Sequence, residues 1–442
     1  MRTYFKLPLL IVTILSIAIN ANAQKLLQEI KNNPNKAGGV YCLYKFDNPK
    51  YTEAPEGYEP FYISHYGRHG SRWLSKERNY TYVKEKFDKA AEAGILTEKG
   101  KEIYAKVTEV FNDARYRAGT LTPLGYIQHR GIAERMAENF HEVFCDGATI
   151  NASSTTYPRC IISMAAFCER LKELNPKLNT TLTSDLRATR TLNFFHKDAN
   201  PELTKEFLDF VDHGKWKQEY KVMAKQYIKT GRIMHELFTD TEFISEEEAT
   251  EMIKQLYYWA VNIQGTEINE KVSLYDIFTP EELYNICIYD NYYFFMLDGP
   301  SSVNKGTAEY YARVLLEDII QKADSAIAGK GHSADLRFGH DSSIMPLVSL
   351  MQFKEFNFDR NETDPAKVIE KWDMSEITPM ATNIQFILFR KGNDVLVKVM
   401  HNEHEMHLPL KAVKGVFYKW NEFKDFYSDY ISSLSYPDEG IE

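Results

Sequence analysis

Apolar and β-forming residues gather in three short stretches, and each stretch runs into a turn and then into a helical pattern. Phe61–His65 is the first, Ala148–Ala152 precedes Pro158, and Asp335–Phe338 precedes apolar residues at helical spacing over Ile344–Met351. Proline is acceptable as the first residue of a helix. Strand–turn–helix units of this kind predict an α/β fold with a doubly wound, mainly parallel sheet.

Two long stretches between these units, roughly 75–144 and 201–331, carry mainly helical patterns. The second is longer than a simple crossover needs, so we expect it to form most of a helical cap. Near the C-terminus, Ile384–Phe389 and Val395–Met400 predict a β-hairpin. The expected organisation is a signal peptide at 1–23, an α/β core from 24–74, 145–200 and 332–442, and mainly helical segments at 75–144 and 201–331.

The first residues have the pattern of a secretory signal peptide. Arg2 and Lys6 precede an apolar run from Leu7 to Ile19, and Ala21-Asn22-Ala23 forms a small-residue cleavage site. The run of about 13 residues is shorter than the roughly 20 needed to span a bilayer, so we expect no membrane span. The pattern predicts export to the periplasm or the medium.

Composition narrows the function classes. The 442 residues are 44% hydrophobic and 26% charged, which is typical of a globular protein. Without residues 1–23 the chain holds 51 basic and 62 acidic residues, a net charge of −11. This charge excludes a general nucleic-acid binder but permits a small positive pocket. No CxxC pair is present, which argues against a cysteine zinc site.

The densest chemical motif is Arg68-His69-Gly70-Ser71-Arg72, directly after the first predicted strand. Glycine lets the backbone turn sharply and approach a ligand. Two arginines offer bidentate donors to a phosphate, while a neutral imidazole can attack phosphorus and carry the phosphoryl group. The nearby cations also disfavour the imidazolium form of His69. A basic surface turn is the alternative.

A second motif, Gly339-His340-Asp341, follows the third predicted strand. His340 could donate to phosphate oxygens, and Asp341 could protonate a leaving alkoxide. Asp341 could instead cap the helix that begins there.

Together these motifs resemble those of the histidine acid phosphatases, the clade-two branch of the histidine phosphatase superfamily. The resemblance is carried by Arg68–Arg72, Ser154–Arg159 and Gly339–Asp341, with Leu121–Gly125 in support, and it spans about Tyr62 to Asn402. Many bacterial phytases of the family use His-Asp, whereas its inositol polyphosphate phosphatases often carry His-Ala-Glu. Relatives often have an acidic pair where this chain has Tyr157-Pro158.

The resemblance implies a role for each motif residue. His69 would be the nucleophile that becomes phosphohistidine, and Asp341 would protonate the leaving group. The phosphate would be held by Arg68, Arg72, Arg159 and His340. Water would then release inorganic phosphate, with no metal and no other cofactor required.

Two further clusters each have a functional and a non-functional interpretation. The run from His401 to His407 could bind a divalent ion or form a solvated loop. The basic residues Lys76, Arg78, Lys84 and Lys86 could line a pocket mouth or form a solvated helical face.

We therefore expect an exported phosphomonoesterase whose partner is a small-molecule phosphate ester, with inositol polyphosphates such as phytate as the leading substrates. A broad-specificity acid phosphatase acting on sugar phosphates is one alternative. A phosphate-ester binding protein without turnover and a metal-binding protein built around His401–His407 are the others. The sequence indicates no oligomeric state.

Overall fold

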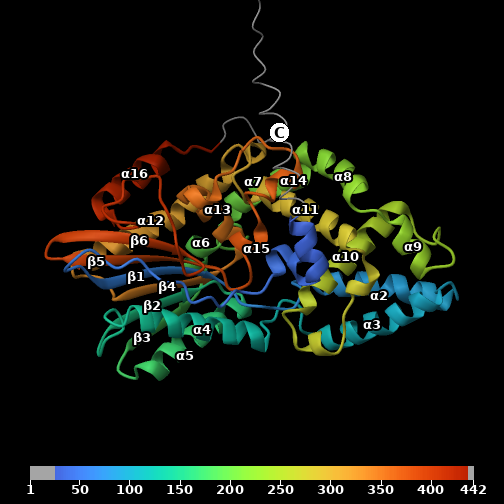
Figure 1. Cartoon of the computed structure of the whole chain (residues 1–442), viewed down its shortest axis with the longest axis horizontal. Helices are drawn as coiled ribbons and strands as arrows, with labels where there is room; N and C mark the ends of the chain where they lie inside the picture. Colours follow the sequence, from blue (N-terminus) through green and yellow to red (C-terminus); the bar gives the residue numbers. More distant parts are fainter. Residues whose placement is uncertain (1–24, 437–442) are drawn as a thin grey trace, which may run out of the picture.

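The computed structural model describes residues 25–436, and within them eight strands form one mixed sheet (Figure 1). The order across the sheet is β3-β2-β4-β1-β5-β6-β7, with β8 paired to β6. The strands are β1 (Glu59–Arg68), β2 (Thr149–Ser154), β3 (Asn179–Ser184), β4 (Ala334–Gly339), β5 (Asn383–Lys391), β6 (Asp394–His401), β7 (His404–Glu405) and β8 (Tyr418–Lys419).

The four strands β3, β2, β4 and β1 are parallel, and the remaining strands are antiparallel to their neighbours. The predicted α/β fold and the late hairpin, β5 and β6, are both confirmed. The first strand is longer than its β-forming core predicts. Gly67 pairs with both β4 and β5. Arg68 pairs with β4, and its N–H donates to the Thr382 carbonyl just before β5, so Arg68 is held by the sheet itself.

Helices cover both faces of the sheet and form a second mass beside it (Figure 1). They are α2 (Glu77–Glu92), α3 (Glu98–Ala114), α4 (Pro123–Asn139), α5 (Pro158–Leu174), α6 (Leu186–Leu192), α7 (Pro201–His213), α8 (Trp216–Tyr227), α9 (Gly231–Leu237), α10 (Glu246–Ile263), α11 (Pro280–Leu297), α12 (Thr307–Ile327), α13 (Asp341–Met351), α14 (Pro365–Val368), α15 (Met374–Ile377) and α16 (Trp420–Ser433). Short 3₁₀ segments are η1 (Pro34–Tyr41), η2 (Glu267–Glu270), η3 (Tyr275–Ile277), η4 (Ser302–Asn304) and η5 (Lys354–Phe356).

Successive residues of β1 enter different hydrophobic cores. Ile63 packs in a core with α4 and α5, whereas Tyr62 and Tyr66 belong to a larger core shared with α12, α13 and the helical mass. Side chains alternate across a strand, so a strand covered on both faces is apolar at nearly every position. This explains why the core of β1 is a continuous run of β-formers.

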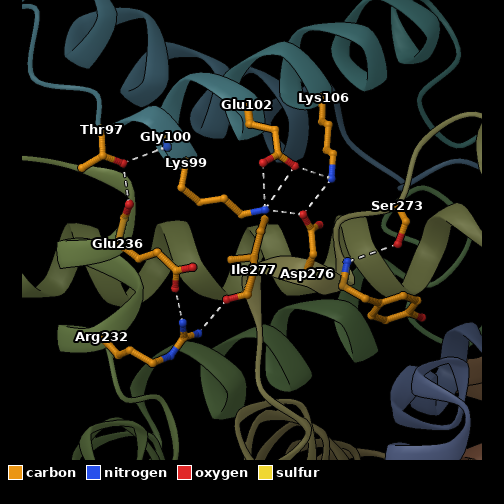
Figure 2. A network of polar contacts seen from close by, with 11 residues as sticks. Thr97, Lys99, Gly100, Glu102, Lys106, Arg232, Glu236, Ser273, Asp276 and Ile277 are labelled. Atoms are coloured by element: carbon orange, nitrogen blue, oxygen red, sulfur yellow. Dashed lines mark hydrogen bonds and ion pairs between the residues drawn. The ribbon is translucent and has the colours of Figure 1, made fainter.

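The two long helical segments are joined by polar contacts. Lys99 and Lys106 on α3 both contact the carboxylate of Asp276, at 2.6 and 2.7 Å, and Thr97 donates to the Glu236 carbonyl (Figure 2). α4 lies elsewhere, on α5 under the sheet (Figure 1). The boundaries drawn between core and cap stay a prediction.

The expected signal peptide lies outside the described residues. In the part of the chain that the structure covers, no helix combines the length and the apolar character needed to cross a bilayer.

Candidate active site

The motif residues meet where the parallel strands end. Arg68 closes β1 opposite Gly339 at the end of β4, and the His69 N–H donates to the Gly339 carbonyl at 3.0 Å. β2 ends beside β4, and α5 begins shortly after it. Carboxyl ends of neighbouring parallel strands share one edge of a sheet, which is where open α/β folds place their ligands. The three sequence motifs therefore form one site.

A cavity of about 390 Å³ lies at this edge. All the expected site residues except Arg68 line it: His69, Arg72, Arg159, His340 and Asp341. Arg68 is fully buried behind them. The alternative of a basic surface turn is wrong, because His69 is 1% and Arg72 is 7% exposed.

The turn after His69 is fixed against the start of α4. A Cβ atom added to Gly70 would lie 2.4 Å from the Gly125 carbonyl oxygen, and one added to Gly125 would lie 2.3 Å from the Ser71 oxygen. Thr122, which caps α4, donates to the Ser71 carbonyl through both its N–H and its hydroxyl. The segment Leu121–Gly125 therefore supports the turn Gly70–Ser71 that follows His69, here called the nucleophile turn.

His69 is held in one tautomer. Its Nδ1 lies 2.9 Å from the Gly70 carbonyl oxygen. Because a carbonyl only accepts, Nδ1 must carry the hydrogen and Nε2 must keep its lone pair. Burial, followed by the charges of Arg159, Arg72 and Arg68, holds the pKa of His69 well below its usual range. The imidazole is thus neutral and nucleophilic at Nε2.

Arg68 connects the site to the scaffold. One guanidinium nitrogen donates to the carbonyls of Val40 and Thr378, at 2.7 and 2.5 Å, and the other forms an ion pair with Asp341 at 2.7 Å. Burial alone would raise the pKa of Asp341, but Arg68 and then Arg72 outweigh it and bring the pKa to about 2. Asp341 is therefore ionised here.

Asp341 is the first residue of α13 rather than its N-cap, which is His340. Its Oδ1 accepts a hydrogen bond from the Ser342 N–H at 3.0 Å. The alternative that Asp341 is the N-cap residue of this helix is thus wrong.

Arg159 and His340 lie against each other. A guanidinium nitrogen of Arg159 is 3.4 Å from Nδ1 of His340, and Nε2 of His340 is 3.1 Å from the Thr155 hydroxyl. Burial, followed by Arg159, lowers the pKa of His340 to about 3. The Tyr157 ring contacts both partners, 4.6 Å from the Arg159 guanidinium and 4.9 Å from the His340 ring. Tyr157 was not predicted as a site residue, although it stands where relatives often carry an acid.

Aromatic and aliphatic side chains form much of the cavity lining. Phe195 and Phe207 stack with ring centroids 3.7 Å apart. Among the described residues lining the cavity, Arg72 and Arg159 supply all the arginine and lysine, and Asp298 is a second carboxylate. The aromatic and aliphatic lining residues are Tyr157, Phe195, Phe207, Leu208, Val211, Tyr293, Phe294 and Leu297, and Ser75, Asn193 and Ser342 add uncharged polar groups.

The basic residues after the first motif do not line this cavity. Lys84 pairs with Asp88 and Lys86 pairs with Glu248. Arg78 lines a neighbouring cavity of about 820 Å³, which shares Val211 and Tyr293 with the first.

The His401–His407 run is solvated only in part, since His404 and His407 are exposed. His401 is buried at the end of β6 and donates to the Ile377 carbonyl, while Glu403 is buried in an ion pair with Arg135. A tight turn through Asn402 and Glu403, both with positive φ, leads into β7. The solvated-loop interpretation is wrong for His401 and Glu403, and within residues 25–436 no three His, Cys, Asp or Glu side chains are grouped to hold a metal ion.

Comparisons with known proteins match both the sequence and the fold. The sequence model of the histidine phosphatase superfamily, branch 2, matches residues 67–402. No curated protein matches the sequence. Among solved structures, the multiple inositol polyphosphate phosphatase of Bifidobacterium longum, in complex with inositol hexasulfate, superposes with a TM-score of 0.75 at 19% identity, covering 88% of this chain and 97% of that one.

Two phytases superpose less well. The phytase of D. castellii has a TM-score of 0.63 at 16% identity, covering 91% of this chain and 86% of that one. The phytase of Citrobacter braakii has a TM-score of 0.51 at 12% identity, covering 84% and 98%. The fold is therefore that of these phosphatases. Among the three it resembles the Bifidobacterium enzyme most. The second motif of this chain is nevertheless His340-Asp341, and not the His-Ala-Glu that inositol polyphosphate phosphatases often carry.

Proposed function

The chain belongs to branch 2 of the histidine phosphatase superfamily, and from this premise we propose that it hydrolyses phosphate monoesters, inositol phosphates foremost, through a phosphohistidine at His69. One observation carries the proposal: a neutral imidazole, fixed with Nε2 free, is surrounded by three arginines. A site that only binds phosphate needs the arginines but has no use for a nucleophile held in this tautomer.

The first half of the reaction transfers the phosphoryl group to the protein. Arg72, Arg159 and His340 hold the phosphate oxygens. Arg68 was expected to hold the phosphate too, but it does not line the cavity; it holds Asp341 and adds positive charge from behind. Nε2 of His69 attacks phosphorus, and the bond from phosphorus to the ester oxygen breaks. Asp341, which binds a proton once the bound phosphate offsets the charge of the arginines, delivers that proton to the departing oxygen.

The second half returns the protein to its starting state. Water attacks the phosphohistidine, Asp341 accepts a proton from that water, and the bond between phosphorus and Nε2 breaks. Inorganic phosphate leaves, and Nδ1 of His69 keeps its hydrogen bond to Gly70 throughout.

The substrate proposal rests on the fold neighbours, one of which holds inositol hexasulfate. A second candidate is broad specificity toward phosphate monoesters, sugar phosphates included. The lining favours it, because aromatic and aliphatic side chains form much of it and, among the described lining residues, only Arg72 and Arg159 supply fixed cations for phosphates.

We also propose that the protein is exported. Arg2, Lys6, the apolar run and the Ala21-Asn22-Ala23 site support cleavage before Gln24. N-terminal sequencing of the protein recovered from the periplasm and the medium tests this, and an intact Met1 in both fractions would contradict it.

Phosphate release from phytate and from p-nitrophenyl phosphate, at mildly acidic pH with a chelator present, tests the catalytic proposal. We expect release by the wild type and a loss of at least about a thousand-fold in His69→Ala. His213→Ala is the matched control, because His213 is 76% exposed and lies outside the cavity lining. Wild-type turnover that survives in His69→Ala would rule out the phosphohistidine.

The substrate ratio separates the two candidates. Preference for phytate supports an inositol phosphate enzyme, and comparable turnover of both esters supports broad specificity. Binding of phosphate esters without any release would support the binding protein instead.

A further inference from the structure

A second carboxylic acid, Asp298, lines the catalytic cavity. It directly follows α11, far along the chain from both catalytic motifs, and it is 7% exposed. The proposed mechanism gives it no role. It nevertheless shares one cavity with His69 and Asp341.

The two aspartates have opposite surroundings. Asp341 has Arg68 at 2.7 Å and accepts the Ser342 N–H at 3.0 Å. Within the described chain, neither oxygen of Asp298 has a hydrogen-bond donor or an ion-pair partner, and its Oδ1 is completely buried. A buried carboxyl group without a donor or a cation is stable only in its neutral form.

The other groups that line the cavity strengthen this difference. Asp341 on α13 is an anion, and Tyr293 on α11 is a neutral phenol whose own pKa is raised. The side chains from α7 are apolar. The cationic groups of the cavity are Arg72 and Arg159, next to the uncharged imidazoles of His69 and His340. Burial, followed by the charge of Asp341, raises the pKa of Asp298 well above its usual value.

The main proposal leaves one proton without a source. Asp341 is ionised in the structure, with its pKa at about 2, yet it must give a proton to the leaving oxygen. A bound phosphate dianion would make Asp341 more basic by compensating the arginines, so Asp341 would then accept a proton from a neighbouring acid.

We propose that Asp298 is a second acid of this active site, which supplies the proton that Asp341 passes to the leaving oxygen. The inference rests on the proposed phosphomonoesterase activity. As Nε2 of His69 bonds to phosphorus and the ester bond breaks, one proton moves from Asp298 through Asp341 to the leaving oxygen, and Asp298 becomes a carboxylate. In the second half, the proton taken from water returns to Asp298, so the cycle balances.

Asp298→Asn tests this, because asparagine is neutral and of the same size but cannot release a proton. The comparison needs two esters: p-nitrophenyl phosphate, whose leaving group departs without a proton, and glycerol 2-phosphate, whose alkoxide requires one. We expect kcat for glycerol 2-phosphate to fall at least about ten-fold while kcat for p-nitrophenyl phosphate changes less than about three-fold.

The pH profile provides a second readout. A proton donor must be protonated to act, so wild-type turnover of the alkyl ester falls as pH rises through the pKa of Asp298. This descending limb is expected to disappear in Asp298→Asn. Asp290→Asn is the matched control, since Asp290 is likewise a buried aspartate, within α11 itself, but lies outside the cavity lining.

The outcomes are distinct. Equal losses on both esters, or no loss on either, would overturn the role of Asp298, whereas a wild type inactive on both would refute the proposed function itself. If Asp298→Asn does not fold, Asp298→Glu is the deciding variant, because glutamate keeps a proton donor. The ratio of alkyl to aryl turnover should then stay within about ten-fold of the wild type. A larger fall in this ratio would overturn the inference.

Discussion

Arg68 joins three separate parts of the chain through one guanidinium group. It donates to backbone carbonyls in η1 and after α15, and it forms the ion pair with Asp341 at the start of α13. Because Arg68 is fully buried, water cannot supply the hydrogen bonds that its planar guanidinium group donates. The residue therefore orders the site and lowers the pKa of Asp341 at the same time.

We predict that Arg68→Lys lowers both stability and activity. A lysine ammonium lacks the fixed fork and leaves buried acceptors unpaired, so the free energy of unfolding should fall by about 1–3 kcal/mol. kcat for alkyl phosphates should fall as well, because Asp341 is no longer held in place. Urea denaturation and phosphate release measure the two effects. Arg187→Lys, an exposed arginine, is the control, and wild-type values for Arg68→Lys would contradict the assigned position.

The sequence predicted the site residues that belong to local motifs and missed those that do not. Arg68–Arg72 and Gly339–Asp341 were found because each combines its chemistry in consecutive residues after a strand. Asp298 follows a helix as an ordinary terminal aspartate, and only the tertiary fold, which brings the end of α11 to the catalytic cavity, makes it a lining residue. Long-range packing leaves no local pattern to detect.

The strands that the sequence did not predict are either rich in polar residues or very short. β3 is rich in threonine and mostly exposed at the sheet edge, and β7 and β8 are two residues each. None has the apolar core that marked β1, β2 and β4. The buried strands were predictable because helices cover both of their faces.

At the scale of elements, the contact between the nucleophile turn and α4 makes a second prediction. Gly125→Ala places a Cβ 2.3 Å from the backbone oxygen of Ser71 and 2.7 Å from its backbone nitrogen. Backbone atoms cannot move aside as the end of a flexible side chain can. We expect a loss of about 1–3 kcal/mol in stability and at least about a ten-fold fall in kcat/KM, since the turn that holds His69 must shift.

Thermal unfolding and phosphate release measure that prediction. Gly231→Ala is the control, because a Cβ added to Gly231 meets nothing within 4 Å and its φ lies outside the left-handed region. A fully active, fully stable Gly125→Ala would show that the turn does not depend on this approach.

For the molecule as a whole, buried histidines set a limit on how acidic its surroundings can be. His65 lies under the active-site edge between Phe167 and Phe338, and His129 lies against Phe338. Burial is the main cause that lowers the pKa of each to about 3. The folded protein keeps both rings neutral, whereas the unfolded chain protonates them near pH 6.5.

Their effect on stability has a definite sign. Between the unfolded and folded pKa values the unfolded state binds more protons, so stability is complete above about pH 6.5 and is lost as pH falls toward about 3. Each such histidine contributes a slope of about 1.4 kcal/mol per pH unit in the middle of that range. Two of them cost several kcal/mol by pH 4, which is a large part of the stability of an ordinary domain.

His65→Leu tests this limit. Both ring nitrogens of His65 are buried without a hydrogen-bond partner within the described chain, so an apolar side chain loses no hydrogen bond there. The free energy of unfolding, measured by urea denaturation from pH 7 to pH 4, should then depend on pH with a slope smaller by about 1.4 kcal/mol per unit. His213→Ala should leave the slope unchanged, because His213 is exposed. An unchanged slope in His65→Leu would mean that His65 titrates normally in the fold. The expected result would mean that protonation of His65 in the unfolded chain limits how far the pH can fall before the core beneath the active site unfolds.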